Sequence, residues 1–175
     1  EVAGMVTTLR ILSTSNSLAE PSLEQFHNRV VVALAGSGAY LILLDDELNQ
    51  VLNTRLAYGT PLGPTSDPDT ARLALERGIA TVSGLFFGQT AQQWVFNVLL
   101  PVPDAPRASL MVLTQNAANL AAALQSRQLP AGWNAALVDR ANLVLAATPG
   151  AGLETGAVLP VRQTLDQSPD EWRRE

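Results

Sequence analysis

Residues 40–55 read YLILLDDELNQVLNTR. An apolar segment is followed by acidic residues at 45–47 and then by a second extended segment from Val51 to Arg55, which is the pattern of a strand, a turn and a strand. A related pattern, LVDRANLVLAAT, returns at 137–148, and Asp139 follows Asp45 by 94 positions (139 − 45). The sequence therefore predicts that the opening hairpin of a sheet occurs twice.

The segments around the first hairpin indicate an α+β fold. Apolar spacing and capping residues predict helices over 1–12, 21–35, 68–78 and 116–127. Short apolar segments between turns predict three more strands, at 80–87, 92–100 and 108–114. The connections between these strands are too short for crossovers, so the neighbours must be antiparallel. We expect one antiparallel sheet of about five strands with flanking helices.

Composition excludes several classes of function. The chain has 175 residues, 47% of them apolar, which suits one globular domain plus a remnant. Its 11 basic and 16 acidic residues leave a net charge of −5, so a nucleic-acid partner is not expected. With no Cys and only His27, a metal site is not expected either, and His27 itself reads as a solvated or core-edge side chain. No apolar run is long enough to span a membrane.

Catalytic motifs are absent from the sequence. There is no nucleophile elbow, no phosphate-binding loop and no dinucleotide fingerprint. The paired acids Asp67 and Asp69 are explained by capping of the helix that follows them. We therefore expect neither an enzyme nor a cofactor, with an unrecognised hydrolase as the weakest of the alternatives.

A family resemblance extends over residues 1–148. The segments that carry it are LEQFH (23–27), YLILLD (40–45), VLNTR (51–55), YGTPL (58–62), VSGLFFG (82–88), VLLPV (98–102), LPAGW (129–133) and LVDR (137–140). In these segments and their order the chain resembles the Cache family of extracytoplasmic sensor domains. The similarity is to the double-Cache arrangement found ahead of bacterial histidine kinases and related transducers.

The resemblance implies a domain organisation. Residues 1–35 would be N-terminal helices that serve as signalling stalk and cover, and 36–128 a membrane-distal PAS-like module with a five-stranded sheet. Residues 129–175 would begin a second, incomplete module, with a helix over 168–175 and with three strands lacking. The N-terminal helix would join two copies into a homodimer through Val2, Met5, Val6 and Leu9.

The resemblance also implies a function. The chain would be the periplasmic, ligand-sensing part of an inner-membrane protein, held by transmembrane segments outside this chain, and its output would be a cytoplasmic histidine kinase. The alternative is a cytosolic scaffold of profilin-like or longin-like fold that acts through protein contacts alone.

Candidate ligand-binding residues follow from the chemistry of a small carboxylate or an amino acid. Arg55 and Tyr58 would clamp and cover a carboxylate, because a guanidinium matches its geometry. In the strand from Gln92, alternate residues point to opposite faces, and one face must line the core or the pocket. The full candidate set is Arg55, Tyr58, Phe87, Trp94, Phe96 and Asn97. Structural roles stay open: Arg55 as a solvated strand end, Tyr58 in loop packing and Trp94 in the core.

Overall fold

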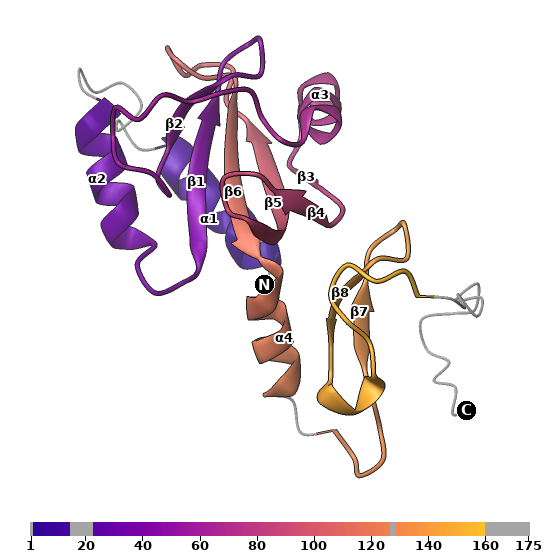
Figure 1. Ribbon diagram of the computed structural model, residues 1–175. Coiled ribbons are helices and arrows are strands. Elements are labelled where there is room, and N and C mark those ends of the chain that lie inside the picture. Colours follow the sequence, from indigo (N-terminus) through magenta and orange to yellow (C-terminus); the bar gives the residue numbers. More distant parts are fainter. Residues whose placement is uncertain (1, 15–22, 127–128, 160–175) are drawn as a thin grey trace.

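A computed structural model describes residues 2–14, 23–126 and 129–159, so the helix expected over 168–175 lies outside the described residues. Its centre is an antiparallel sheet in the order β2-β1-β6-β5-β3, with β4 also paired to β5 (Figure 1). The strands of this sheet are β1 (Ala39–Leu44), β2 (Gln50–Asn53), β3 (Thr81–Val82), β4 (Phe86–Gly88), β5 (Gln93–Pro101) and β6 (Leu110–Asn116). A separate hairpin consists of β7 (Ala136–Val138) and β8 (Val144–Ala147).

Within the described ranges, four α-helices accompany the sheets, and they agree with the four segments predicted there. They are α1 (Val2–Thr14), α2 (Leu23–Ala33), α3 (Pro68–Arg77) and α4 (Ala117–Gln125). For α3 the sequence signals are confirmed at both ends, because the Asp67 side chain caps the first turn and Gly78 ends the helix with a φ of 63°. The mixed α+β architecture with one antiparallel sheet is therefore confirmed.

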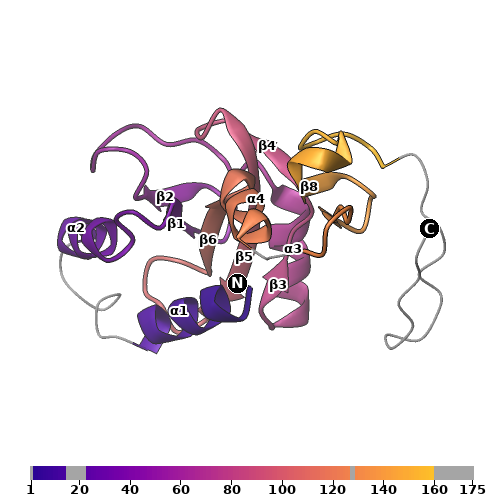
Figure 2. The same cartoon turned by 90° about the horizontal axis from the view of Figure 1, so that it is seen from below.

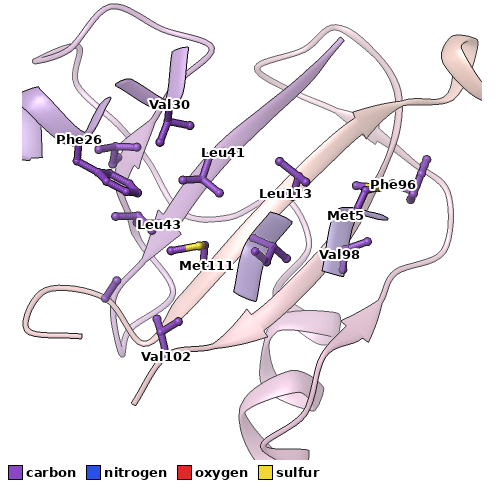
Figure 3. Close-up of a cluster of buried hydrophobic side chains, with 13 residues drawn as sticks. Met5, Phe26, Val30, Leu41, Leu43, Phe96, Val98, Val102, Met111 and Leu113 are labelled. Atoms are coloured by element: carbon purple, nitrogen blue, oxygen red, sulfur yellow. The ribbon is translucent and has the colours of Figure 1, made fainter. Parts of the chain in front are cut away.

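Both faces of the sheet are covered, so successive residues of the central strands enter two different cores. On one face, α1 lies along the sheet (Figure 2) and α2 packs beside it. Figure 3 shows the core on this face, which contains Met5, Leu9, Phe26, Val30, Leu41, Leu43, Leu52, Phe96, Val98, Val102, Ala108, Met111 and Leu113. On the other face, α3 packs through Ala71 and Ala74 against Leu99, Leu110 and Val112.

The apolar stripe of α1 is used within its own chain. Met5 is 6% exposed and Leu9 is fully buried, and both belong to the core between α1 and the sheet. The expectation that these two side chains join two copies is therefore wrong, since they are already covered. The large apolar side chains that α1 exposes are Val2 and Ile11.

The strand predicted over 80–87 is divided into β3 and β4. Both pieces pair with β5, β3 at Val98 and Leu99 and β4 between Gln93 and Val95, so the sheet remains five strands wide. Between them, Ser83 leaves the regular ladder because its hydroxyl accepts a hydrogen bond from the Asn97 N–H at 2.8 Å. The Asn97 N–H thus donates to a side-chain oxygen instead of a backbone carbonyl. The alternation of apolar and polar residues along a strand cannot reveal such an exchange of acceptors.

The two hairpins have the same hydrogen bonds, as their repeated sequence predicts. The N–H of Asp45 donates to the carbonyl of Asn49 at 3.0 Å, and that of Asp139 donates to the carbonyl of Leu143 at 2.9 Å. In both turns the third residue after the Asp has a positive φ, 65° in Leu48 and 63° in Asn142.

The correspondence extends beyond the turns at the same offset. Thr54 Oγ1 accepts from the Leu41 N–H at 2.8 Å, and Thr148 Oγ1 accepts from the Ala135 N–H at 3.1 Å. The isolated bridges Asn49–Pro64 and Leu143–Val158 also correspond. The repeat therefore covers the hairpin and the segment that returns beside it.

Two substitutions in α1 test its packing. We expect Leu9→Ala to lower the free energy of unfolding by about 2–5 kcal/mol, because it opens a cavity under a fully buried side chain. Ile11→Ala, on the same helix but 64% exposed, is the control and should change it by no more than about 0.5 kcal/mol. Urea unfolding followed by circular dichroism measures both, and equal effects would contradict this placement of α1.

Candidate functional site

The candidate site is a row of polar side chains on the face of the sheet that α3 covers. Tyr40 lies opposite Thr114, and Thr114 lies opposite Asn97, so three neighbouring strands place these side chains next to one another. The Thr114 hydroxyl donates to Asn97 Oδ1 at 2.8 Å and is also hydrogen-bonded to the Tyr40 hydroxyl. Their exposed fractions are 7%, 1% and 3% for Tyr40, Thr114 and Asn97. We call this set the polar row.

Burial of the polar row changes the acidity of Tyr40. Removal from water raises the pKa of the Tyr40 phenol above its ordinary value of 10.0, and the hydrogen bond to Thr114 and the charge of Arg55 oppose this only in part. Buried polar groups are unfavourable unless they are paired, and each member of the row has its partner within the protein. The groups that a ligand would contact are thus already satisfied by one another.

A carboxylate stands at the Asn97 end of the row. Asn97 Nδ2 donates to Asp67 Oδ2 at 3.4 Å, while Asp67 Oδ1 accepts from the Thr70 N–H at 3.3 Å. The first residue before α3 therefore has two functions, since it caps the helix and faces the polar row.

A guanidinium stands at the Tyr40 end. The Arg55 Cζ lies 5.4 Å from the centre of the Tyr40 ring, within the range of a cation–π contact. Arg55 Nη2 also donates to the carbonyl of Ala91 at 3.2 Å, which ties the end of β2 to the turn between β4 and β5. The polar row therefore lies between a positive and a negative group.

The cavity over the polar row is small. Its volume is about 20 Å³, which is space for roughly one water molecule. Its walls come from the sheet, from the loop before α3 and from the segment around β4; they are Tyr40, Ile42, Gln50, Thr65, Ser66, Phe86, Gly88, Gln89, Thr90, Asn97 and Thr114. A ligand of several heavy atoms requires one of these walls to move.

Tyr58 lies away from this cavity, against α2. Its ring makes an edge contact with His27, with ring centres 5.7 Å apart, and it is 45% exposed. His27 is buried, and its Nε2 donates to the carbonyl of Leu56 at 2.9 Å. Because a carbonyl oxygen only accepts, Nε2 carries the proton. His27 is thus a core-edge residue that holds the loop after β2, in agreement with its sequence context.

Three candidates from β4 and β5 are aromatic: Phe87, Trp94 and Phe96. Unlike Asn97, none of them lines the cavity over the polar row. Phe96 is 2% exposed in the core beneath α1, on the opposite face of the sheet. Trp94 lies two residues before Phe96 in the same strand, so the alternation places it on the same face. Its ring makes an edge contact with the Phe87 ring, with the ring centres 5.8 Å apart, and Phe87 is 49% exposed. Of the six candidates, the structure brings Asn97 and Arg55 to the polar row.

Sequence reasoning missed Tyr40, Thr114 and Asp67. Thr114 and Asn97 are polar positions within otherwise apolar strands, and this signal was visible. Only the strand pairing shows that these positions are neighbours, because it sets which residue lies opposite which. Asp67 was fully explained by its capping role, which concealed its second contact.

A larger cleft lies beyond the far end of β1. Its volume is about 630 Å³, and its lining includes Asp45, Asp46, Glu47, Pro103 and Arg107. Asp46, Glu47 and Arg107 are exposed, and Asp45 is used in its own turn, where Oδ1 accepts from the Asn49 N–H at 2.8 Å. Solvated turn residues of this kind show no convergent binding geometry, so we place the candidate site at the smaller cavity.

Among the described residues, no group of three or more His, Asp or Glu side chains is arranged to hold a metal ion. No helix in the described ranges has the length and apolar character needed to cross a bilayer.

Comparison with known proteins gives structural matches and no sequence matches. No protein-family model and no curated protein matches the chain. The extracellular domain of rpHK1S-Z16, described as a histidine kinase, is similar with a TM-score of 0.69 and 18% identity, over 90% of this chain and 66% of that one. The ligand-binding domain of the Pseudomonas fluorescens chemoreceptor CtaA, in complex with L-serine, matches with a TM-score of 0.62 and 15% identity, over 86% and 65% of the two chains.

A third match is the ligand-binding domain of the Campylobacter jejuni chemoreceptor Tlp3 in complex with L-valine. Its TM-score is 0.60 at 13% identity, over 85% of this chain and 64% of that one. The chain thus spans slightly less than two thirds of the length of these structures. It has the fold of the extracellular sensor domains of histidine kinases and chemoreceptors, as the Cache resemblance implies.

The Tyr40 phenol makes stability depend on pH on the alkaline side. Because burial raises its pKa, the folded protein retains a proton that the unfolded chain releases above pH 10.0. This stabilisation is complete below pH 10.0 and is lost as the pH rises toward the raised pKa. We expect the free energy of unfolding to decline over this range, and to decline less in Tyr40→Phe.

Urea unfolding at a series of pH values above neutrality measures this difference. The sequence contains no Lys, so no side-chain amine titrates over the same range. An equal alkaline decline in both chains would contradict the assignment to Tyr40.

Proposed function

We propose that this chain is the extracytoplasmic sensing part of a membrane-bound signal transduction protein, and that residues 36–128 bind a small amino acid or carboxylate. One observation carries the proposal: a buried polar row, flanked by Arg55 and Asp67, faces a small cavity in this fold. Solved domains of the same fold are in complex with L-serine, L-valine and L-Gln.

The charges at the two ends of the polar row suit a zwitterion. Arg55 can pair with a carboxylate through two parallel N–H groups. Asp67 keeps an oxygen directed at Asn97 and can accept from an ammonium group. Between them, the hydroxyl oxygens of Tyr40 and Thr114 have lone pairs left that can accept further hydrogen bonds. An amino acid presents both charges in one small molecule, so it matches this arrangement better than a simple anion does.

Binding must be coupled to opening of the cavity. An amino acid does not fit in about 20 Å³, so the ligand has to displace either the loop that contains Thr65 and Ser66 or the segment around β4. Arg55 holds the second of these segments through the Ala91 carbonyl. A ligand carboxylate that attracts the guanidinium would release Ala91, so recognition and opening would use the same side chain.

The β7–β8 hairpin is proposed to begin a second module of the same kind. Its hydrogen bonds repeat those of the first hairpin at an offset of 94, for example Asp45 to Asn49 and Asp139 to Leu143. The site residues of the first hairpin are not repeated in the second: Asn134 corresponds to Tyr40 and Val144 to Gln50. We therefore assign ligand binding to the first module.

The remaining parts of the assignment concern the whole protein. We propose that the parent lies in an inner membrane, with this chain on its periplasmic side, and that the output is a cytoplasmic histidine kinase. Similarity in fold to the extracellular domain of rpHK1S-Z16 supports this choice. A dimer formed through α1 would have to use the exposed Val2 and Ile11.

Thermal unfolding with a panel of ligands tests the proposal. The panel is the standard L-amino acids with acetate, lactate and succinate. A ligand present at about 100 times its Kd should raise the free energy of unfolding by about 2.7 kcal/mol. Arg55→Ala should weaken the Kd of that ligand by about tenfold or more, since a charge-assisted hydrogen bond contributes roughly 1.5–3 kcal/mol.

Arg107→Ala is the matched control for the loss of a guanidinium. Arg107 is exposed and lines the cleft beyond the far end of β1, so its removal should leave the Kd unchanged. If no member of the panel stabilises the chain, the small-ligand proposal fails and the protein-interaction scaffold is favoured.

A further inference from the structure

The N–H of Leu85 has its acceptor in a distant part of the chain. Leu85 lies in the break between β3 and β4 and is 6% exposed. Its N–H donates to Asp139 Oδ2 at 2.9 Å, and Asp139 belongs to the turn of the β7–β8 hairpin. A buried N–H without an acceptor is unfavourable, so the hairpin supplies what this edge of the sheet lacks.

The contact between the two parts is close. A Cβ built on Gly84 would lie 3.0 Å from Asp139 Oδ2, so a larger residue there would displace the carboxylate. A Cβ on Gly156 would overlap the Trp94 ring, which therefore rests directly on the backbone that returns beside β8. Two separate points thus join the β4–β5 edge to the hairpin.

The same edge segment borders the cavity over the polar row. Phe86, Gly88 and Thr90 belong to the walls of that cavity, and Phe86 follows Leu85 directly in the sequence. At the other end of the segment, the Ser83 N–H donates to the carbonyl of Asn97 at 2.9 Å. Residues 83–91 therefore have the cavity on one side and the hairpin on the other.

The first hairpin shows what Asp139 would do without this contact. In both turns Oδ1 accepts from the N–H four residues on, at 2.8 Å in Asp45 and 2.9 Å in Asp139. The second oxygen differs, because Asp45 Oδ2 has only a 3.5 Å contact to Asn49 Nδ2 within its own turn. The turn therefore requires one oxygen of each carboxylate, and the second oxygen of Asp139 has a further role.

We propose that Asp139 is a positioning residue that couples the edge segment 83–91 to the β7–β8 hairpin. If the segment moves to open the cavity, the Leu85 N–H either carries Asp139 and its hairpin along or loses its acceptor. The ligand-binding site is thereby linked to the proposed second module. The biological meaning of this link rests on the proposed function, but the link itself is testable without any ligand.

Substitution by Asn separates the two roles of the carboxylate. In Asp139→Asn the remaining oxygen can accept from the Ala141 and Leu143 N–H groups, which Oδ1 serves at present, while the amide nitrogen faces the Leu85 N–H and cannot accept from it. We expect the Leu85 amide to exchange with deuterium about tenfold faster, measured by NMR on this chain. Asp45→Asn is the matched control and should leave exchange at Leu85 unchanged.

A second pair of variants tests transmission from the cavity side. Arg55→Ala removes the hydrogen bond to Ala91 and should raise exchange in residues 136–147 of the hairpin by several-fold. In the Asp139→Asn background the same change should have a smaller effect there, because the Asp139 contact is broken and the contact of Trp94 with Gly156 remains.

Two results would overturn the inference. One is equal exchange at Leu85 in Asp139→Asn and Asp45→Asn. The other is an equal increase in hairpin amide exchange when Arg55→Ala is made in the unchanged chain and in the Asp139→Asn chain. Neither result depends on ligand binding, whereas the proposed function fails only if the ligand panel has no effect on thermal unfolding.

Discussion

The pairing of β5 with β6 is the constraint on which the rest of the molecule depends. Every residue at 95–99 and at 110–115 is buried, so each side chain of these strands must suit one of two covered faces. A shift of β5 by one residue would bring Phe96 to the cavity and Asn97 to the apolar core under α1. The hydrogen bond between Asn97 and Thr114 on one face and the packing of Phe96 on the other therefore select the same register.

Much of the fold was predictable because its signals are local. The first hairpin follows from an apolar segment and an acidic turn, and α3 follows from Asp67 and Gly78 at its ends. The break between β3 and β4 was not predictable, since it depends on Ser83 and on an acceptor 54 residues after Leu85. The site could be predicted only in part for the same reason. Asn97 stands out in the sequence as a polar position within an apolar strand, but strand pairing decides which residues lie beside it.

The two hairpins share their backbone hydrogen bonds but differ in their polar and charged side chains. Both copies keep the Asp turn and the Thr that closes the strand pair, at Thr54 and Thr148. Tyr40, in contrast, is replaced by Asn134 in the second copy, and the position of Arg55 is occupied by Pro149. The two hairpins therefore share a backbone but differ in the side chains at the positions of Tyr40 and Arg55.

The interrupted edge of the sheet also bears on how the protein behaves at high concentration. An outer strand with a continuous line of unpaired N–H and C=O groups invites another chain to add to it, which leads to aggregation. Here β3 has 2 residues and β4 has 3, and the Leu85 N–H between them is turned toward Asp139. The opposite margin, β2, has only 4 residues. With such short margins, the sheet offers little template for the growth of fibrils.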